Sequence, residues 1–263
     1  MFPVTSYNAL GRLPYGQVLY NRNDEYIGRS IEMYGEYSAV ETTAFDQVVG
    51  ENQIVVDAGA NIGVHTLFLA RKVGPAGRVL AFEPQRLMFQ TLCGNLALNS
   101  ITNTYCWNMA LGETPGETVV PCLDPTVPHN FGGVSLDAGG EGEPVAVTTI
   151  DNFHLPRCDF IKIDVEGMEE QVLRGAEQTI RRFKPILYLE CDRVEKEASL
   201  IRCLDAFGYQ MFWHLPPLFN PANFNDNPEN VFGDIVSRNM LCFDKAREHE
   251  LTGFEPVHVP KAA

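Results

Sequence analysis

The sequence predicts a doubly wound α/β domain, in which helices cover both faces of a mostly parallel sheet. Three observations support this fold class. From residue 54 onward, short apolar runs alternate with amphipathic stretches. A glycine-rich loop follows the first of these runs and precedes a helical pattern. The chain has 263 residues, of which 45% are hydrophobic, which is enough for one large core and excludes a disordered protein.

Strand patterns and helical patterns follow one another along the chain. Helical patterns lie at 67–73, 87–98, 176–183 and 195–207. Strands are expected at 54–57, 78–83, 104–109, 160–164, 186–190, 209–214 and 240–243. The alternation of the two is typical of a sheet whose strands are joined by crossover helices.

Ahead of this alternation, the sequence predicts a small lid-like extension over residues 1–50. Residues 15–20 and 25–28 flank an Asn23-Asp24 turn and indicate a hairpin. Ser38 and Glu41 match the capping box of a following helix, which Gly50 can end. The cofactor domain is expected at 51–250, with irregular insertions at 112–144 and 216–230 and a tail at 251–263. Insertions of that length in a compact domain are usually functional or disordered.

Composition excludes several classes of partner. Lys and Arg total 20 against 34 Asp and Glu, so the formal net charge is −14. Nucleic acids and anionic membrane surfaces require clustered basic residues, so neither is an expected partner. Seven cysteines are present, and no pair has the C-x-x-C spacing of a metal or redox site. Without an N-terminal targeting pattern, the chain is expected to be a cytoplasmic protein with reduced thiols.

The glycine-rich loop VVDAGANIGVHT spans residues 55–66. Gly59 and Gly63 allow a sharp turn and a close approach of the backbone to a ligand, and the following helix offers free N–H groups. Glu83 ends the next strand, twenty residues after Gly63. In a nucleotide-binding βαβ unit, a carboxylate at that place accepts hydrogen bonds from ribose hydroxyls. We therefore expect a cofactor that contains a ribose.

The glycine spacing favours S-adenosyl-L-methionine (SAM) over a dinucleotide. A dinucleotide site requires G-x-G-x-x-G, with a pyrophosphate at the helix N-terminus, and neither that spacing nor its last glycine is present here. SAM has no phosphates, and its ammonium and sulfonium groups favour nearby acids such as Asp57. The expected product is S-adenosyl-L-homocysteine (SAH).

Three segments carry a family resemblance. The loop VVDAGANIGVHT, the tetrapeptide AFEP at 81–84 and the run IKIDVEGMEEQVLRGA at 161–176 resemble the FkbM family of SAM-dependent methyltransferases over residues 54–190. The resemblance implies a class I methyltransferase fold, with a seven-stranded sheet whose last strand pair is antiparallel. It also implies O-methylation of sugar or polyketide hydroxyls.

The candidate cofactor residues come from the ends of several strands. The third strand ends where this fold usually meets adenine, and Tyr37 precedes the lid helix in a turn that can fold over the amino-acid end of the cofactor. His65, in the first turn of the cofactor helix, is expected to be exposed or to support the site from behind. The cofactor-binding residues are expected to be Asp57, Gly59, Ala60, Asn61, Gly63, Thr66, Glu83, Pro84, Asn108, Met109, Ala110, Asp164 and Tyr37.

A second group of residues is expected to act on the acceptor. An alcohol is a poor nucleophile, so a positioned base should take its proton, which contributes a factor of about 10² to 10⁴ in rate. Glu166, Asp164 and His214 are the catalytic candidates. Glu190 and Asp192 add oxygen ligands of the kind that Mg²⁺ accepts, but no compact ligand motif joins them, so no metal is expected.

The leading hypothesis is a SAM-dependent O-methyltransferase that acts on a small-molecule, sugar, glycan-like or polyketide-like acceptor. One alternative is an NAD-dependent oxidoreductase on a Rossmann sheet. Another is a catalytically silent SAM-binding module, since fold does not imply function. The substrate-recognising segments are expected around Tyr34, in the 112–144 insertion and in the Asn/Pro-rich 216–230 stretch. The oligomeric state is left open, with a homodimer as one alternative.

Overall fold

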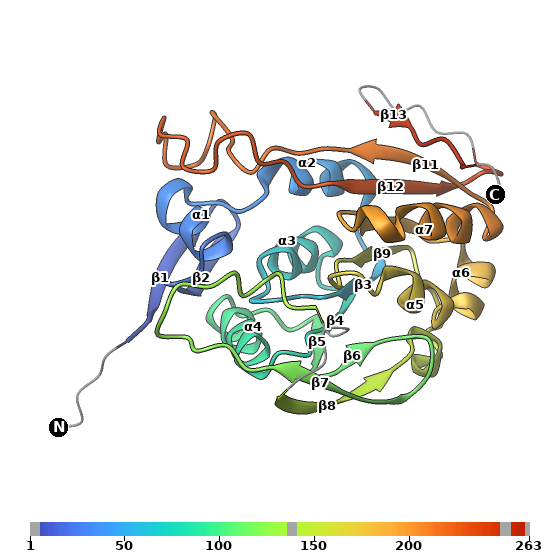
Figure 1. The fold of residues 1–263 in the computed structure, drawn as a ribbon, viewed down its shortest axis with the longest axis horizontal. Helices are drawn as coiled ribbons and strands as arrows, with labels where there is room; N and C mark the ends of the chain where they lie inside the picture. The colour runs from blue at the N-terminus through green and yellow to red at the C-terminus, as the bar shows by residue number, and fades with distance from the viewer. Residues whose placement is uncertain (1–5, 136–140, 248–253, 261–263) are drawn as a thin grey trace.

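The computed structural model describes residues 6–135, 141–247 and 254–260. Its centre is an eight-stranded sheet with the order β13-β11-β12-β10-β9-β3-β4-β5 (Figure 1). The strands are β3 (Ile54–Ala58), β4 (Arg78–Phe82), β5 (Thr104–Trp107), β9 (Phe160–Ile163), β10 (Ile186–Glu190), β11 (Tyr209–His214), β12 (Asn239–Asp244) and β13 (Glu255–Pro256). Strands β5, β4, β3, β9 and β10 are parallel, whereas β12 is antiparallel to both β10 and β11.

Helices cover both faces of this sheet, as the alternating pattern predicts (Figure 1). They are α2 (Ala39–Val48), α3 (Val64–Val73), α4 (Arg86–Leu98), α5 (Glu169–Arg174), α6 (Glu177–Phe183) and α7 (Val194–Ala206). Buried residues of α5, α6 and α7 form one large core cluster with the sheet. A second cluster joins α2 and α3 to the same strands. The doubly wound fold class is therefore confirmed.

All seven expected strands are present, and the last pair is antiparallel. The expected count of seven is exceeded by one, because β13 adds an edge strand beside β11, with Phe212 opposite Pro256 and Trp213 opposite Glu255. This strand belongs to the predicted tail 251–263, of which only residues 254–260 are described.

The predicted N-terminal hairpin is present but shifted. Strands β1 (Asn8–Leu13) and β2 (Gly16–Asn21) form it, and the prediction of a strand at 25–28 was wrong. Those residues lead into helix α1 (Ile27–Tyr34). The carboxylate of Asp24 accepts the backbone N–H groups of Tyr26 and Ile27, both at 2.9 Å, and this satisfies donors of a helix start instead of closing a hairpin turn.

The predicted helix after Ser38 is present as α2, but its capping box is not formed. Ser38 Oγ donates to Glu41 Oε1 at 2.7 Å and makes no hydrogen bond to the helix N-terminus. The helix ends at Val48, two residues before Gly50.

The insertion 112–144 contributes to a small separate sheet. Strands β6 (Ala110–Leu111), β7 (Gly116–Pro121) and β8 (Gly142–Thr148) pair in the order β6-β8-β7, and a short 3-10 turn, η2 (Ile150–Phe153), follows. The expectation of an irregular insertion therefore understated the strand content. Residues 136–140 of this insertion lie outside the described part.

The Asn/Pro-rich stretch 216–230 is bound to α1 and the turn after it. Tyr34 Oη donates to the carbonyl of Glu229 at 2.8 Å and accepts the N–H of Val231 at 2.9 Å. The carboxylate of Glu36 accepts Asn220 Nδ2 at 2.9 Å and the N–H of Phe224 at 3.0 Å. The amides of Asn223, Asn225 and Asn227 form further hydrogen bonds, within this stretch or to the carbonyl of Met33 in α1. These contacts fix the stretch against α1, and we call them the clamp.

Within residues 6–135, 141–247 and 254–260, the helices are too short or too polar to cross a membrane.

Candidate functional site

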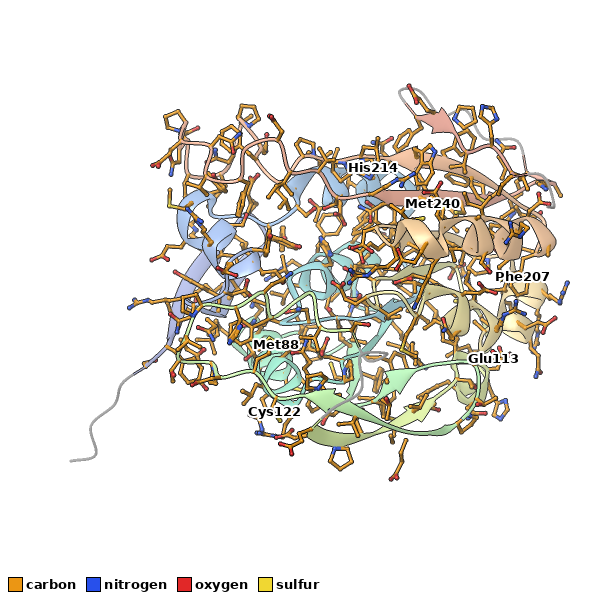
Figure 2. The ribbon with its side chains drawn as sticks, viewed as in Figure 1. Met88, Glu113, Cys122, Phe207, His214 and Met240 are labelled. Carbon is orange, nitrogen blue, oxygen red and sulfur yellow. The ribbon has the colours of Figure 1, made fainter. Side chains whose placement is uncertain are left out.

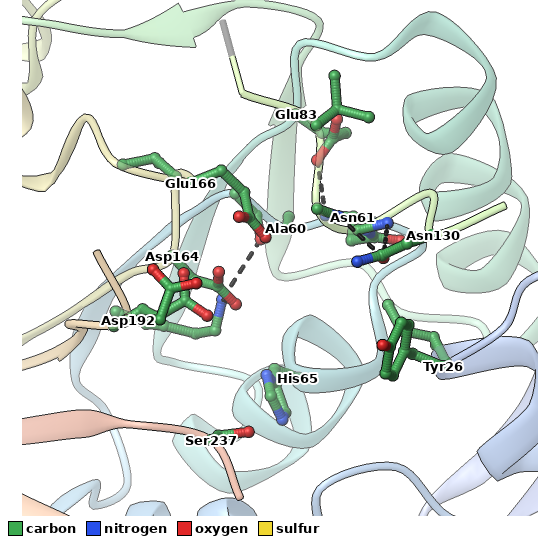
Figure 3. A pocket seen from close by; sticks show the side chains of 18 of the residues that line it. Tyr26, Ala60, Asn61, His65, Glu83, Asn130, Asp164, Glu166, Asp192 and Ser237 are labelled. Carbon is green, nitrogen blue, oxygen red and sulfur yellow. Dashed lines mark hydrogen bonds and ion pairs between the residues drawn. The ribbon is translucent and has the colours of Figure 1, made fainter. Parts of the chain in front are cut away.

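A cavity of about 580 Å³ opens at the carboxyl ends of the parallel strands, where open α/β sheets bind their ligands. The loops after β3, β4, β9 and β10 form its inner wall (Figure 3). Tyr26 and Tyr37 close it from the N-terminal segment, and residues 235–238 close it on the β12 side. Segments from both ends of the chain therefore meet at one site.

The glycine-rich loop forms the floor of this cavity. Gly59 has φ +79°, and a Cβ there would collide with the carbonyl oxygen of Asp164. Gly63 has φ +87° and precedes α3, where a Cβ would meet Leu92. The backbone N–H groups of Gly59 and Ala60 both donate to the carbonyl of Phe82, at 3.0 and 2.9 Å. The glycines let the loop turn sharply, as the sequence predicts, and pack closely against its neighbours.

Glu83 lies at the end of β4 and lines the cavity. Its carboxylate accepts the N–H of Asn61 at 2.8 Å and the N–H of Gln85 at 2.7 Å. A carboxylate has about four acceptor positions, so it retains capacity for a ligand. Burial raises the pKa of Glu83 to about 7, although the two backbone N–H groups favour its charged form.

Asn108 supports this loop from outside the cavity lining. Its Nδ2 donates to the carbonyls of Glu83 and Pro84, both at 2.9 Å. Pro84, Met109 and Ala110 line the cavity themselves. The segment after β5 therefore lines the cavity, with Asn108 as a supporting residue, and its contact with adenine stays a prediction.

Asp57, Thr66 and Lys162 form a buried cluster beneath the glycine loop. Thr66 Oγ1 donates to Asp57 Oδ2 at 2.6 Å. Lys162 Nζ lies 3.4 Å from Asp57 Oδ1 and 3.3 Å from both the carbonyl of Gly59 and Asp164 Oδ2. Asp57 and Thr66 do not line the cavity, whereas Lys162 does. Their contacts hold the loop in place from below.

Sequence reasoning missed Lys162, because it sits in the apolar run of β9. The available signal was a lysine within a strand that is buried on both faces. Lysine side chains are rarely buried unless they pair with a carboxylate, so this position could have indicated a buried ion pair. Burial lowers the pKa of Lys162, but the carboxylates of Asp164, Asp57 and Glu41 outweigh burial and hold this pKa above its usual value.

Carboxylates line the cavity wall beyond β9 and β10. Asp164, Glu166 and Glu190 each place an oxygen within 4.8 Å of the others. Glu166 pairs with Arg193 at 2.6 Å, and Asp164 pairs with Lys162. Burial, together with Asp164, raises the pKa of Glu166 to about 8. Glu190 Oε2 is buried and has no hydrogen-bond partner among the described residues, and burial raises the pKa of Glu190 well above the usual value.

The structure separates the three catalytic candidates. Asp164 and Glu166 line the cavity. His214 does not; it lies on β11 (Figure 2), where its Nδ1 is 2.8 Å from the hydroxyl of Tyr188. His214 is therefore held in the sheet, away from the space that a substrate could enter.

His65 differs most from its expected place. It is 7% exposed and points from α3 into the cavity (Figure 3). Its Nε2 is buried, has no hydrogen-bond partner in the described part of the chain, and lies 3.9 Å from Glu41 Oε2. The rings of Tyr37 and Phe45 pack against it, and burial lowers its pKa, which favours a neutral imidazole at physiological pH. Glu41, which the sequence suggested only as a capping residue, thus belongs to the surroundings of the site.

The fold and the site together define a class of protein. Without the edge strand β13, the sheet has seven strands in the order β5-β4-β3-β9-β10-β12-β11, and β12 runs opposite to the other six. This arrangement is the class I, Rossmann-like methyltransferase fold. The profile described as "Methyltransferase FkbM domain" matches residues 57–211. The chain belongs to the FkbM methyltransferase family.

Two curated relatives are similar over part of the chain. "Methyltransferase 1" of Beauveria bassiana is 31% identical over 147 residues, covering 48% of this chain and 59% of the relative. "Methyltransferase sdnD" of Sordaria araneosa is 29% identical over 168 residues, covering 48% of this chain and 61% of the relative. The chain thus matches about three fifths of the length of these relatives. The crystal structure of Methyltransferase FkbM from Methylobacillus flagellatus KT is 19% identical, with a TM-score of 0.48, covering 77% of this chain and 50% of that one.

Proposed function

We propose that this protein transfers a methyl group from SAM to a hydroxyl of a small-molecule, sugar, glycan-like or polyketide-like acceptor and releases SAH. One observation carries the proposal: Glu83 and the glycine loop face the same cavity as the carboxylates of Asp164, Glu166 and Glu190. A ribose-binding carboxylate and an acidic wall suit a nucleoside cofactor that carries positive charge.

The residues present fit this cofactor. Gly59 and Gly63 let the loop pack directly against Asp164 and Leu92 at the base of the cavity, and Glu83 keeps acceptor capacity for ribose hydroxyls. Asp164 and Tyr37 would face the amino-acid end, and Met109 and Ala110 the adenine. The remaining proposed cofactor residues are Ala60, Asn61 and Pro84, with Asp57, Thr66 and Asn108 acting from behind. When bound, SAM supplies an electrophilic methyl group on a sulfonium.

The protein's part in the reaction is alignment and proton removal. Methyl transfer is an in-line displacement, so holding the acceptor oxygen in line with the methyl group is the main requirement. Glu166, with Asp164 beside it, is our proposed base for the hydroxyl proton. Its raised pKa, about 8, lies close to physiological pH, where a general base works well. His214 has no direct role in this scheme, because it lies outside the cavity.

The two alternatives find less support. An NAD-dependent oxidoreductase would place a pyrophosphate beside an acidic wall, and the chain has no G-x-G-x-x-G loop. A silent SAM-binding module would share the loop and Glu83, and therefore differs from our proposal only in catalysis.

Isothermal titration with SAM, SAH and NADH tests the cofactor. We expect binding of SAM and SAH and none of NADH; no binding of SAM at high micromolar concentration would refute the proposal. Incubation with methyl-labelled SAM and fractionated metabolites then tests the reaction. Label in a hydroxyl-bearing product supports O-methylation, whereas binding without transfer to any fraction favours the silent module.

A further inference from the structure

Three exposed aliphatic side chains lie at the outer edge of the cavity. Val194, the first residue of α7, is 71% exposed, and Ile235 and Val236 are 43% and 50% exposed. All three also line the cavity. Single exposed apolar residues are normal on protein surfaces, but three at one opening form an apolar patch, which we call the rim.

The rim is one surface, although its members come from different segments. Arg238 Nη1 pairs with Glu197 Oε2 of α7 at 2.7 Å, and the carbonyl of Arg238 accepts the N–H of Cys191 at 2.7 Å. A β-bridge between Pro217 and Val236 fixes the other side. These contacts hold residues 235–236 near the start of α7.

Part of the cavity wall has the opposite character. With Glu83 and Asp164 assigned to the cofactor, the carboxylates of Glu166 and Glu190 and the imidazole of His65 remain for an acceptor (Figure 3). A ligand that fills the cavity and reaches the rim therefore meets polar groups inside and aliphatic groups outside. An entirely polar ligand would leave the aliphatic side chains of the rim exposed to water. An entirely apolar ligand would bury the carboxylates without hydrogen-bond partners, which is unfavourable in free energy.

We propose that the rim formed by Val194, Ile235 and Val236 binds an apolar portion of the methyl acceptor, whose hydroxyl-bearing portion enters the cavity. The acceptor is thus amphipathic, and the rim sets its preference for an aliphatic or aromatic body. This inference rests on the proposed function, because it assigns the part of the cavity beside the cofactor to the acceptor of a methyl transfer.

Alkyl glycosides of increasing chain length test the rim. We would titrate methyl, butyl, hexyl and octyl β-D-glucopyranoside, below their micellar concentrations, into the protein saturated with SAH, and repeat the series with 1,2-alkanediols. Burying a methylene group improves affinity about three- to fourfold. We expect at least one series to show about tenfold or greater tightening from the shorter to the longer chains.

The double variant Val194→Ser, Val236→Ser removes the aliphatic surface at exposed positions, where substitutions cost little stability. We expect it to flatten the chain-length series to less than about threefold while SAH affinity stays unchanged. Val127→Ser, at another exposed valine outside the cavity lining, is the matched control and keeps the gradient.

Several results would overturn the inference. Chain length without effect in both series, or a gradient that the double variant retains, would overturn it while SAH binding leaves the proposed function standing. Rim-dependent binding to neutral phosphatidylcholine vesicles would assign the rim to a lipid surface instead. If neither SAM nor SAH binds, the proposed function itself fails, and the inference fails with it.

Discussion

The ammonium group of Lys162 lies 3.4 Å from Oδ1 of Asp57, in the interior of the protein beneath the glycine loop. Both side chains are almost fully buried, at 3% and 0% exposed. Asp57 Oδ1 has no hydrogen bond within the described residues, so Lys162 is the group that compensates its charge. The same ammonium reaches the carbonyl of Gly59 and the carboxylate of Asp164. The pair therefore connects the floor of the cavity to its acidic wall.

Lys162→Met should lower the free energy of unfolding by about 3–5 kcal/mol, because it leaves Asp57 as an uncompensated buried charge. Urea unfolding measures this change. Lys72→Met is the control: it breaks the surface pair with Asp46 and should cost no more than about 1 kcal/mol. Equal stability of the Lys162 variant and the wild type would show that Asp57 does not depend on this lysine.

The features that the sequence predicted are those encoded locally. Three local features led to the correct fold and family: the glycine spacing, the position of Glu83 after an apolar strand, and the IDVEG turn at 163–167. Each of them can be recognised within a few residues. Contacts between distant segments were not accessible in this way. The burial of His65 depends on Tyr37 and Phe45 of the N-terminal segment, and the use of the 216–230 amides depends on α1.

The same reasoning accounts for two candidates that lie outside the cavity lining. His214 ends β11 at the same edge of the sheet as Glu190, but β12 lies between the two strands, and the imidazole contacts the hydroxyl of Tyr188 instead of the cavity. Thr66 occupies the first turn of α3, yet its hydroxyl turns back to Asp57. In both cases a short polar contact, invisible in the sequence, decides where the side chain points.

Gly59→Ala should disrupt the cofactor loop, because φ +79° is unfavourable for alanine and its Cβ would collide with the carbonyl of Asp164. Backbone strain of this kind costs about 1–3 kcal/mol, and we expect loss of SAH binding even where the variant folds. Thermal unfolding and SAH titration measure the two effects. Gly116→Ala, with open space around the added Cβ, should leave both unchanged. Wild-type SAH affinity in the Gly59 variant would contradict the close approach.

Tyr34→Phe should loosen the clamp between α1 and the 216–230 stretch. The change removes the hydroxyl that bonds to the carbonyl of Glu229 and to the N–H of Val231. These backbone groups are only partly buried, so each lost hydrogen bond costs about 0.5–1.5 kcal/mol, and we expect faster proteolysis within 216–230. Tyr105→Phe, at a half-exposed tyrosine of β5, is the control. Unchanged proteolysis would mean that Glu36 and the amides of Asn225 and Asn227 hold the stretch without this hydroxyl.

Glu83 gives stability and cofactor binding opposite dependences on pH. Its pKa in the folded protein is about 7, above the ordinary value of 4.5, chiefly through burial. Between these values the folded protein holds a proton that the unfolded chain has released. This contribution to stability is therefore fully present below pH 4.5 and is lost as the pH rises through 7. Cofactor affinity has the opposite pH dependence and increases as the pH rises through 7, because the ribose hydroxyls donate hydrogen bonds to the charged carboxylate.

We therefore expect SAH affinity to rise about tenfold from pH 6 to pH 8, as Glu83 loses its proton. Glu83→Gln should weaken binding and abolish this rise, since an amide does not titrate. Glu41 has a similarly raised pKa, about 7, but does not line the cavity, so Glu41→Gln should keep the rise. Calorimetric titration across this pH range distinguishes the two residues. A pH dependence that disappears with Glu41 instead of Glu83 would remove the ribose assignment.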